Sequence, residues 1–348
     1  MRRPRPTPGV KDVAALAGVS ASTVSNYLNR PEVVNERTRL RIDRAVRQLG
    51  FIRNESARQL RGGTSRTFGV VLRDAWLPVF GQLARGIEDT ASPGGWTVLF
   101  SDSAGDPECE LRYLDAFAAM RVRGILVVPQ QDLRSALRNM QRQGIVCVTV
   151  EQPAGAADIH SVEIDNRAGG RTAAEHLLSM GRRHFLLAGD PTGAPDVRDR
   201  FDAFTATVAA AGATWCLTSV GGLTVRDGAA VGRQISETDP DNRPDAVFAA
   251  TDLIAVGVLH ELLAAGIAVP GSIAVLGYDD LDIAAHVAVP LSTIGQPAYE
   301  MGVVATKMLI SGMEGQHLPG DAHRVFEPIV IARESTLGWA GHRRAHDC

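Results

Sequence analysis

The 348-residue sequence is poor in cysteine and in aromatic side chains, and it has no long apolar run. Its four cysteines (Cys109, Cys147, Cys216 and Cys348) lie far apart, without the spacing of a metal or redox site, so we expect them to be reduced. No apolar run reaches the roughly 18 residues that a membrane span needs. The basic, proline-rich start lacks the apolar stretch of a secretory signal. We therefore expect a cytoplasmic protein with no membrane partner.

Motifs for catalysis are also missing. The sequence has no Gly-x-Gly-x-x-Gly after a strand, no phosphate-binding Gly-x-x-x-x-Gly-Lys loop and no Gly-x-Ser-x-Gly elbow. Asp279 and Asp280 form a carboxylate pair, but no nucleophile or metal site lies beside them. The nine histidines show no ligand spacing, apart from His342 and His346 in the tail. We expect no catalytic residue, no bound metal and no cofactor.

Charge is distributed unevenly along the chain. Residues 1–66 hold 14 Lys/Arg and 5 Asp/Glu, whereas the other 282 residues hold 22 and 34. A small basic module on an acidic body is typical of a nucleic-acid-binding protein. A solvated arm or a membrane-surface segment is the alternative, but no long apolar face accompanies the arginines.

Residues 10–29 predict two short helices joined by a tight turn. Val13, Ala14 and Ala17 form the apolar stripe of the first helix, and Gly18 ends it, because glycine accepts a positive φ. Ser20 is suited to cap the second helix. In that helix Val24, Tyr27 and Leu28 face inward, while the outward residues are small and polar: Ala21, Ser22, Ser25 and Asn26. Such a face suits a helix that enters the major groove of DNA, although any surface helical hairpin fits the same pattern.

A third helix and a linker follow this pair. Asn35 is suited to cap the third helix, Gly50 to end it, and Ile42, Val46 and Leu49 form its inward stripe. Asn54 begins a helix that is too short to be stable alone and would form only against a partner surface.

From Phe68 onward, apolar runs alternate with helical segments. The runs span residues 68–72, 96–100, 124–128, 146–150, 184–188, 246–250 and 273–277. Nearly continuous apolar strands between helices predict parallel sheets buried on both faces. The series is too long for one sheet, so we expect two doubly wound lobes, with the passage between them in the loop at 151–165. Ligands bind beyond the carboxyl ends of such strands, so the lobes define a cleft.

Residues 10–338 resemble the lactose/galactose repressor family of bacterial transcription regulators. The resemblance rests on the two-helix segment and on a series of short motifs: Leu49-Gly50-Phe51, residues 54–60, Gly86-Ile87-Glu88, Asp165-Asn166, residues 200–204, residues 277–280 and residues 293–297. It implies an N-terminal all-α helix-turn-helix headpiece and an α/β periplasmic-binding-protein-like core of two doubly wound parallel-sheet lobes. The implied function is a sequence-specific DNA-binding transcriptional regulator, a repressor controlled by a small effector.

The resemblance implies the DNA contacts. They are Lys11, Ser20, Ala21, Ser22, Thr23, Ser25, Asn26, Asn29, Asn54, Ala57 and Leu60. Many relatives have arginine where this chain has Asn26, and asparagine favours adenine over guanine. A phosphate contact or a plain surface position is the alternative for Asn26. Leu60 is expected to wedge into the minor groove beside its symmetry mate, or else to pack beneath the core.

The resemblance also places an effector site in the cleft. Its residues are Trp76, Phe80, Glu151, Ile164, Arg200, Leu223, Thr251, Asp279 and Gln296. Arg200 and Asp279 act as polar clamps for a ligand rich in hydroxyls or amides. The alternatives are a surface pair of Arg200 with Asp199 or Asp202, and a helix cap at Asp279. Phe80 and Trp76 are candidates for stacking on a ligand face, with Phe80 the better one, and Trp76 is otherwise a lid or a core residue. Thr251 and Leu223 differ from common sugar binders, so a modified sugar or a nucleoside is an open alternative.

These observations define a domain plan. It comprises a disordered arm (1–9), the helix-turn-helix domain (10–52), a hinge helix and linker (53–66), the core (67–338) and a tail (339–348). The first lobe takes about 67–163 and 292–322, and the second about 164–291 and 323–338. The expected partners are palindromic operator DNA, a small-molecule effector and a second copy in a homodimer. A solute-binding protein without a DNA role, or an enzyme that uses the cleft, is the alternative function.

Overall fold

The computed structural model describes residues 8–51, 65–152, 159–192, 195–316 and 323–338. The chain forms two compact units, Met1–Ser65 and Arg66–Cys348, which are described separately. No helix in the described ranges has the length and apolar character needed to cross a membrane.

The first unit is a small bundle made of helices α1 (Val10–Ala17), α2 (Ala21–Asn29) and α3 (Glu36–Leu49), with a 3-10 turn at Pro31–Val33. Gly18 ends α1 with a φ of 62°, in the left-handed region that glycine tolerates. The Ser20 side chain accepts a hydrogen bond from the Thr23 backbone N–H and begins α2, and Asn35 caps α3 in the same way through Thr38. The predicted helices, caps and glycine stops are therefore confirmed.

Six buried residues form the core of this unit: Val13, Ala14, Ala17, Val24, Ile42 and Ala45. Two polar contacts tie the helices together around this small core. The hydroxyl of Tyr27 donates to Asp43, and the Arg41 guanidinium donates to the carbonyl oxygens of Ala17 and Gly18, at 2.5 and 2.9 Å. Arg41 thus closes the carboxyl end of α1, so its role is structural.

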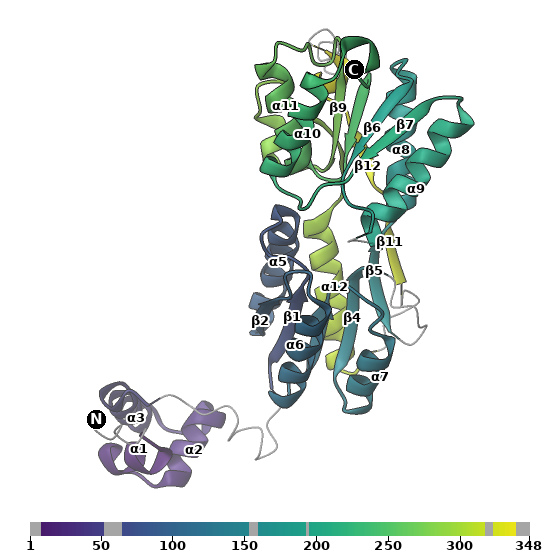
Figure 1. Cartoon of the computed structure of the whole chain (residues 1–348). Helices are drawn as coiled ribbons and strands as arrows, with labels where there is room; N and C mark the ends of the chain where they lie inside the picture. Colours follow the sequence, from purple (N-terminus) through teal and green to yellow (C-terminus); the bar gives the residue numbers. More distant parts are fainter. Residues whose placement is uncertain (1–7, 52–64, 153–158, 193–194, 317–322, 339–348) are drawn as a thin grey trace, which may run out of the picture. The chain divides into compact units, whose positions relative to one another are not determined.

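The second unit has two lobes, each built on a six-stranded sheet (Figure 1). The first sheet has the order β11-β5-β4-β3-β1-β2, all parallel. Its strands are β1 (Thr67–Leu72), β2 (Thr97–Asp102), β3 (Gly124–Val127), β4 (Val146–Glu151), β5 (His160–Ile164) and β11 (His323–Phe326). Helices α5 (Pro78–Ala91) and α12 (Ala298–Met313) cover one face, and α6 (Pro107–Ala119) and α7 (Arg134–Arg142) cover the other.

The second sheet has the order β12-β10-β9-β8-β6-β7, with only β12 antiparallel. Its strands are β6 (His184–Ala188), β7 (Thr214–Thr218), β8 (Ala246–Ala249), β9 (Ala274–Asp279), β10 (Ser292–Gly295) and β12 (Ile329–Ile331). The pairs α8 (Asn166–Ser179) with α9 (Pro195–Ala210), and α10 (Val225–Glu237) with α11 (Asp252–Ala264), flank it on opposite sides (Figure 1). A short helix, α13 (Glu334–Leu337), packs against β9 and β10.

The chain passes between the lobes after β5, after β10 and between β11 and β12. Three details of the prediction need correction. The segment 151–165 is not only a passage, because it contains β5. β10 belongs to the second lobe, since it pairs with β9, and β11 belongs to the first, since it pairs with β5. Pairing between strands distant in sequence decides these boundaries, and short strands carry little pattern of their own.

Candidate functional site

Polar residues from both lobes meet where the strands of the two sheets end. Arg73 directly follows β1 and Glu151 is the last residue of β4, both in the first lobe. Asp196 and Arg200 lie in the first two turns of α9, and Asp279 ends β9, all in the second lobe. All five are buried. The parallel topology brings these side chains together, because the carboxyl ends of its strands share one edge.

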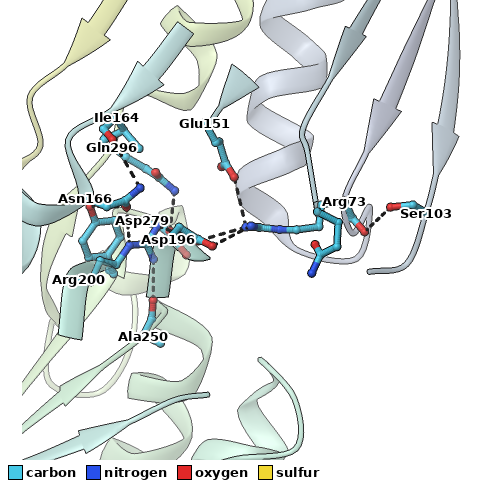
Figure 2. A network of polar contacts seen from close by, with 12 residues as sticks. Arg73, Ser103, Glu151, Ile164, Asn166, Asp196, Arg200, Ala250, Asp279 and Gln296 are labelled. Carbon is cyan, nitrogen blue, oxygen red and sulfur yellow. Dashed lines mark hydrogen bonds and ion pairs between the residues drawn. The ribbon is translucent and has the colours of Figure 1, made fainter. Parts of the chain in front are cut away.

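A chain of ion pairs connects four of them, all but Asp279 (Figure 2). The Arg73 guanidinium contacts both carboxylate oxygens of Asp196, at 2.8 and 3.2 Å, and an oxygen of Glu151 at 3.2 Å. Arg200 contacts the same Asp196 carboxylate at 3.3 Å. Two arginines and two acids therefore alternate across the space between the lobes, which satisfies charges that would be costly to bury alone.

Arg200 is only 3% exposed, and several protein groups contact its guanidinium. Its Nε donates to the Asn166 side chain at 2.8 Å and its Nη1 to the carbonyl of Ala250 at 3.1 Å. Its Cζ lies 3.6 Å from the centre of the Tyr278 ring. The surface pair with Asp199 or Asp202 is wrong, because Arg167 contacts those two acids instead.

Asp279 and Gln296 form a second buried contact beside this chain. The Gln296 amide donates to Asp279 Oδ1 at 2.7 Å. The Asp279 side chain thus turns toward Gln296, where the chain passes from β10 to α12, and does not cap the next helix. Within the described residues, the Gln296 Oε1 atom has no hydrogen-bond partner. Asp279 also has a φ of 114°, a strained value for a residue other than glycine.

Burial and neighbouring charge set the pKa values here. Burial raises the pKa of Glu151 and of Asp279 above their ordinary values, and nearby guanidinium groups only partly oppose this. Burial also acts on Asp196, but that carboxylate lies between Arg73 and Arg200, which lower its pKa to about 2. Asp196 is therefore the firmly ionised acid of the group.

Four other predicted effector residues lie in different surroundings. Leu223 lines a cavity between the lobes, and Ile164 ends β5, where its carbonyl accepts from Asn166 at 3.5 Å. Thr251 serves as the cap of α11, accepting from the Ile254 backbone. Trp76 does not line the described cavities and is 89% exposed.

Phe80 does not present a free ring to a ligand. It is 1% exposed, and the Arg73 guanidinium lies 5.4 Å from its ring centre. A cation already occupies the stacking position that the sequence suggested for a ligand.

Two cavities flank the ion pairs. One of about 290 Å³ is lined mainly by Arg73, Asp74, Leu77, Gln130, Val197 and the loop 220–223. The other, of about 340 Å³, is lined by residues 129–134 with Leu137, Thr149, Gln152 and Pro195. Both draw on the two lobes, and a small polar molecule fits their volume.

The outer face of α2 in the headpiece is open. Ala21, Ser22 and Asn26 are exposed, and Ser25 is half-buried beneath the Asn29 side chain, which donates to its carbonyl. Thr23 is half-buried, and the other predicted contacts of this unit, Lys11, Ser20 and Asn29, are exposed. Asn54, Ala57 and Leu60 lie outside the described residues.

The sequence reasoning missed Arg73, Asp196 and Gln130 and did not count Asn166 among the site residues. A signal existed for two of them. Arg73 is a charge placed directly after a buried strand, and Asp196 stands four residues before Arg200, on the same helical face. Gln130 carried no comparable signal.

Comparisons with known proteins agree with this arrangement. Residues 9–54 match the model "Bacterial regulatory proteins, lacI family", and residues 174–336 match "Periplasmic binding protein-like domain". The chain is 33% identical to the ribose operon repressor of Bacillus subtilis (strain 168), over 94% of this chain and 98% of that protein.

Solved structures show the same fold. The lac repressor dimer bound to operator and the anti-inducer ONPF has a TM-score of 0.80 and 24% identity, covering 94% of this chain and 99% of that one. The CelR–cellobiose complex, also a transcriptional regulator, has a TM-score of 0.66 and 28% identity, with the same coverage of both chains.

A helix-turn-helix unit joined to a two-lobed binding core defines a DNA-binding transcriptional regulator whose core accepts an effector. The chain belongs to the lacI family of bacterial regulatory proteins, and the relative it matches along nearly its whole length is a repressor.

Proposed function

We propose that this chain represses transcription by placing α2 in the major groove of an operator. The observation that carries this is the outer face of α2, which is small, polar and exposed while its inner face is buried in the three-helix core. Ala21, Ser22 and Asn26 lie in its first turn and a half, where a recognition helix approaches base edges. Lys11, Ser20, Thr23, Ser25 and Asn29 are proposed to contact the phosphate backbone.

The effector is proposed to be a small polar metabolite of the sugar class, bound between the lobes. Arg200, Asp279, Gln296 and Glu151 are buried and do not line the two cavities, but their charged and amide groups suit the hydroxyls of a ligand that displaces their present contacts. The CelR relative is a complex with cellobiose, and the Bacillus relative is named for the ribose operon. Leu223 and Leu77 make one cavity partly apolar, which also fits a nucleoside or a modified sugar.

Regulation is proposed to follow from the lobe angle. Effector binding changes the preferred angle between the lobes, and that change reaches the linker 53–66, where a helix stabilised on DNA would gain or lose support. Two chains acting as a homodimer would read the two halves of a palindrome. In this account the protein acts on chromosomal DNA in the cytoplasm, by binding and without catalysis.

Genome-wide mapping of bound DNA tests the first part. We expect a small number of palindromic sites upstream of transport or catabolic genes, whose identity points to the effector. Exchange of Asn26 for alanine should reduce enrichment at these sites, whereas exchange of the exposed Gln234 in α10 should not. Equal, unselective recovery of DNA by both variants would reject sequence-specific binding.

Thermal-shift and calorimetric screening of sugars and nucleosides tests the second part. A true effector should stabilise the wild-type protein and change its operator affinity. Arg200→Met should lose the effect, while Arg233→Met, which removes an exposed pair with Glu261 in the same lobe, should retain it. A compound that binds both variants equally does not use the cleft.

A further inference from the structure

Arg73 reaches from one lobe into the other. Its backbone follows β1 of the first lobe, and its carbonyl accepts from Ser103 at 3.3 Å. Its guanidinium forms a two-pronged contact with Asp196, in the first turn of α9 of the second lobe (Figure 2). A planar guanidinium matches a carboxylate in this way with strict geometry, so the contact fixes both distance and orientation.

The bridge is buried and has further support in the first lobe. The Glu151 carboxylate lies 3.2 Å from the same guanidinium, and the Phe80 ring lies beneath it. Opening the lobes would separate Arg73 from Asp196 and leave Asp196 with Arg200 alone. A charge that stays buried without its partner is costly, so the contact opposes any separation that does not also hydrate Arg73 and Asp196.

The bridge also divides the space between the lobes. Pro195 lines one cavity and Val197 lines the other, so the two residues beside Asp196 face different cavities. Gln130 lines both, and Arg73 lines the 290 Å³ cavity. The guanidinium therefore stands at the centre of the region where a ligand would touch both lobes.

We propose that Arg73 is a built-in bridge that holds the two lobes together without an effector, by its paired contact with Asp196. Two-lobed proteins close around ligands that touch both halves, and here a side chain of the protein supplies such a contact. An effector must therefore bind beside the bridge or displace it. This inference concerns the core alone and holds whether or not the protein binds DNA.

Spin labels on opposite sides of the cleft measure the lobe separation. Glu108→Cys at the start of α6 and Arg226→Cys at the start of α10 are exposed sites, each close in sequence to residues that line the 290 Å³ cavity. They are placed in the full chain with Cys109, Cys216 and Cys348 changed to serine, and mixed with excess unlabelled chain. Unliganded protein with Arg73 should give one narrow distance distribution by dipolar electron paramagnetic resonance.

Arg73→Met keeps an unbranched side chain but removes the guanidinium and its charge. We expect it to shift the distribution to longer distances or to broaden it severalfold. Asp196→Asn, which keeps the shape, should act in the same direction. The matched control is Arg85→Met, which removes an exposed pair with Asp89 within α5 and should leave the distribution unchanged.

The outcomes separate cleanly. Unchanged distances in the folded Arg73→Met and Asp196→Asn variants would overturn the bridge. A broad distribution in the unliganded protein with Arg73 intact would also overturn it, even if neither variant folds. Circular dichroism establishes folding, and operator binding is measured separately, so failure of the DNA proposal leaves this result interpretable.

Discussion

At the scale of single residues, the buried acids of the core differ in their charged neighbours. Asp196 lies between two guanidinium groups, and its pKa falls to about 2. Asp252, in the first turn of α11, lacks such a neighbour at contact distance, and burial raises its pKa to about 7. Two aspartates of one lobe thus depart from their ordinary pKa in opposite directions because their neighbours differ.

Asp252 makes stability depend on pH in a defined direction. The folded protein holds this proton more tightly than the unfolded chain does, so the free energy of unfolding falls as the pH rises from about 4 to about 7. Asp252→Asn cannot ionise, so wild type should lose stability relative to the variant over this window. One pKa unit corresponds to roughly 1.4 kcal/mol, and we expect a relative change on the order of 3 kcal/mol. Urea unfolding of both proteins at pH 5 and pH 8 measures it, and parallel changes would contradict the assignment.

The proposed base recognition depends mainly on the exposed side-chain amide of Asn26. Asn26→Ala should weaken operator binding by roughly 1–3 kcal/mol, the range for a lost two-bond contact to a base. Binding to unrelated DNA should be nearly unchanged, because phosphate contacts supply it. Titration of operator and scrambled duplexes at one salt concentration compares the two. An equal loss on both duplexes would indicate a phosphate contact instead.

At the scale of elements, the first lobe depends on the close approach of α5 and α12. A Cβ on Gly86 would lie 2.1 Å from the Tyr299 carbonyl oxygen, and one on Gly302 would lie 2.3 Å from that of Leu83. Small residues at these positions let the two backbones touch. The chain passes from the second lobe to the first at Gln296, between β10 and α12. The packing of α12 on α5 therefore anchors this passage in the first lobe.

Gly86 and Gly81 offer a matched pair in α5. Gly86→Ala should destabilise the core by roughly 1–3 kcal/mol, because the backbone of α12 must move. Gly81→Ala meets nothing within 4 Å and should be neutral or stabilising by up to about 1 kcal/mol, since alanine favours helices. Thermal unfolding of the two variants distinguishes them. Similar midpoints would show that the helices separate at little cost.

At the scale of the whole molecule, the proposed function needs two chains and one bent duplex. The headpiece is small and one copy would make few base contacts, so we expect affinity to depend on pairing two copies across a palindrome. The linker residue Leu60, which lies outside the described residues, is the predicted wedge in the minor groove.

Leu60→Ala tests this arrangement. We expect palindromic operator binding to weaken by over about 1 kcal/mol and the bend of the bound duplex to decrease, because a pair of wedges is lost. Gel mobility with circularly permuted fragments reports bend and affinity together. Sedimentation should show an unchanged dimer, and unchanged bend and affinity would reject the wedge.

The headpiece was predictable in detail because its signals are local. Ser20, Asn35, Gly18 and Gly50 act within three or four residues of the chain, and the apolar stripes repeat at helical spacing. The seven predicted strands of the core lie within two residues of observed ones, because strands buried on both faces are nearly continuous apolar runs. The five other strands, β5, β7, β10, β11 and β12, are short or mixed in polarity, lack such runs and were missed.

The amino-acid sequence by itself determined the helix-turn-helix unit, the two-lobed α/β architecture and the charge asymmetry. Only the tertiary structure decided that β10 joins the sheet of the second lobe and β11 that of the first. It alone also decided that Arg73 contacts Asp196, 123 positions away. The physical reason is the range of the forces. Caps and apolar periodicity act between near neighbours, whereas a buried charge finds its partner through space once the fold has excluded water.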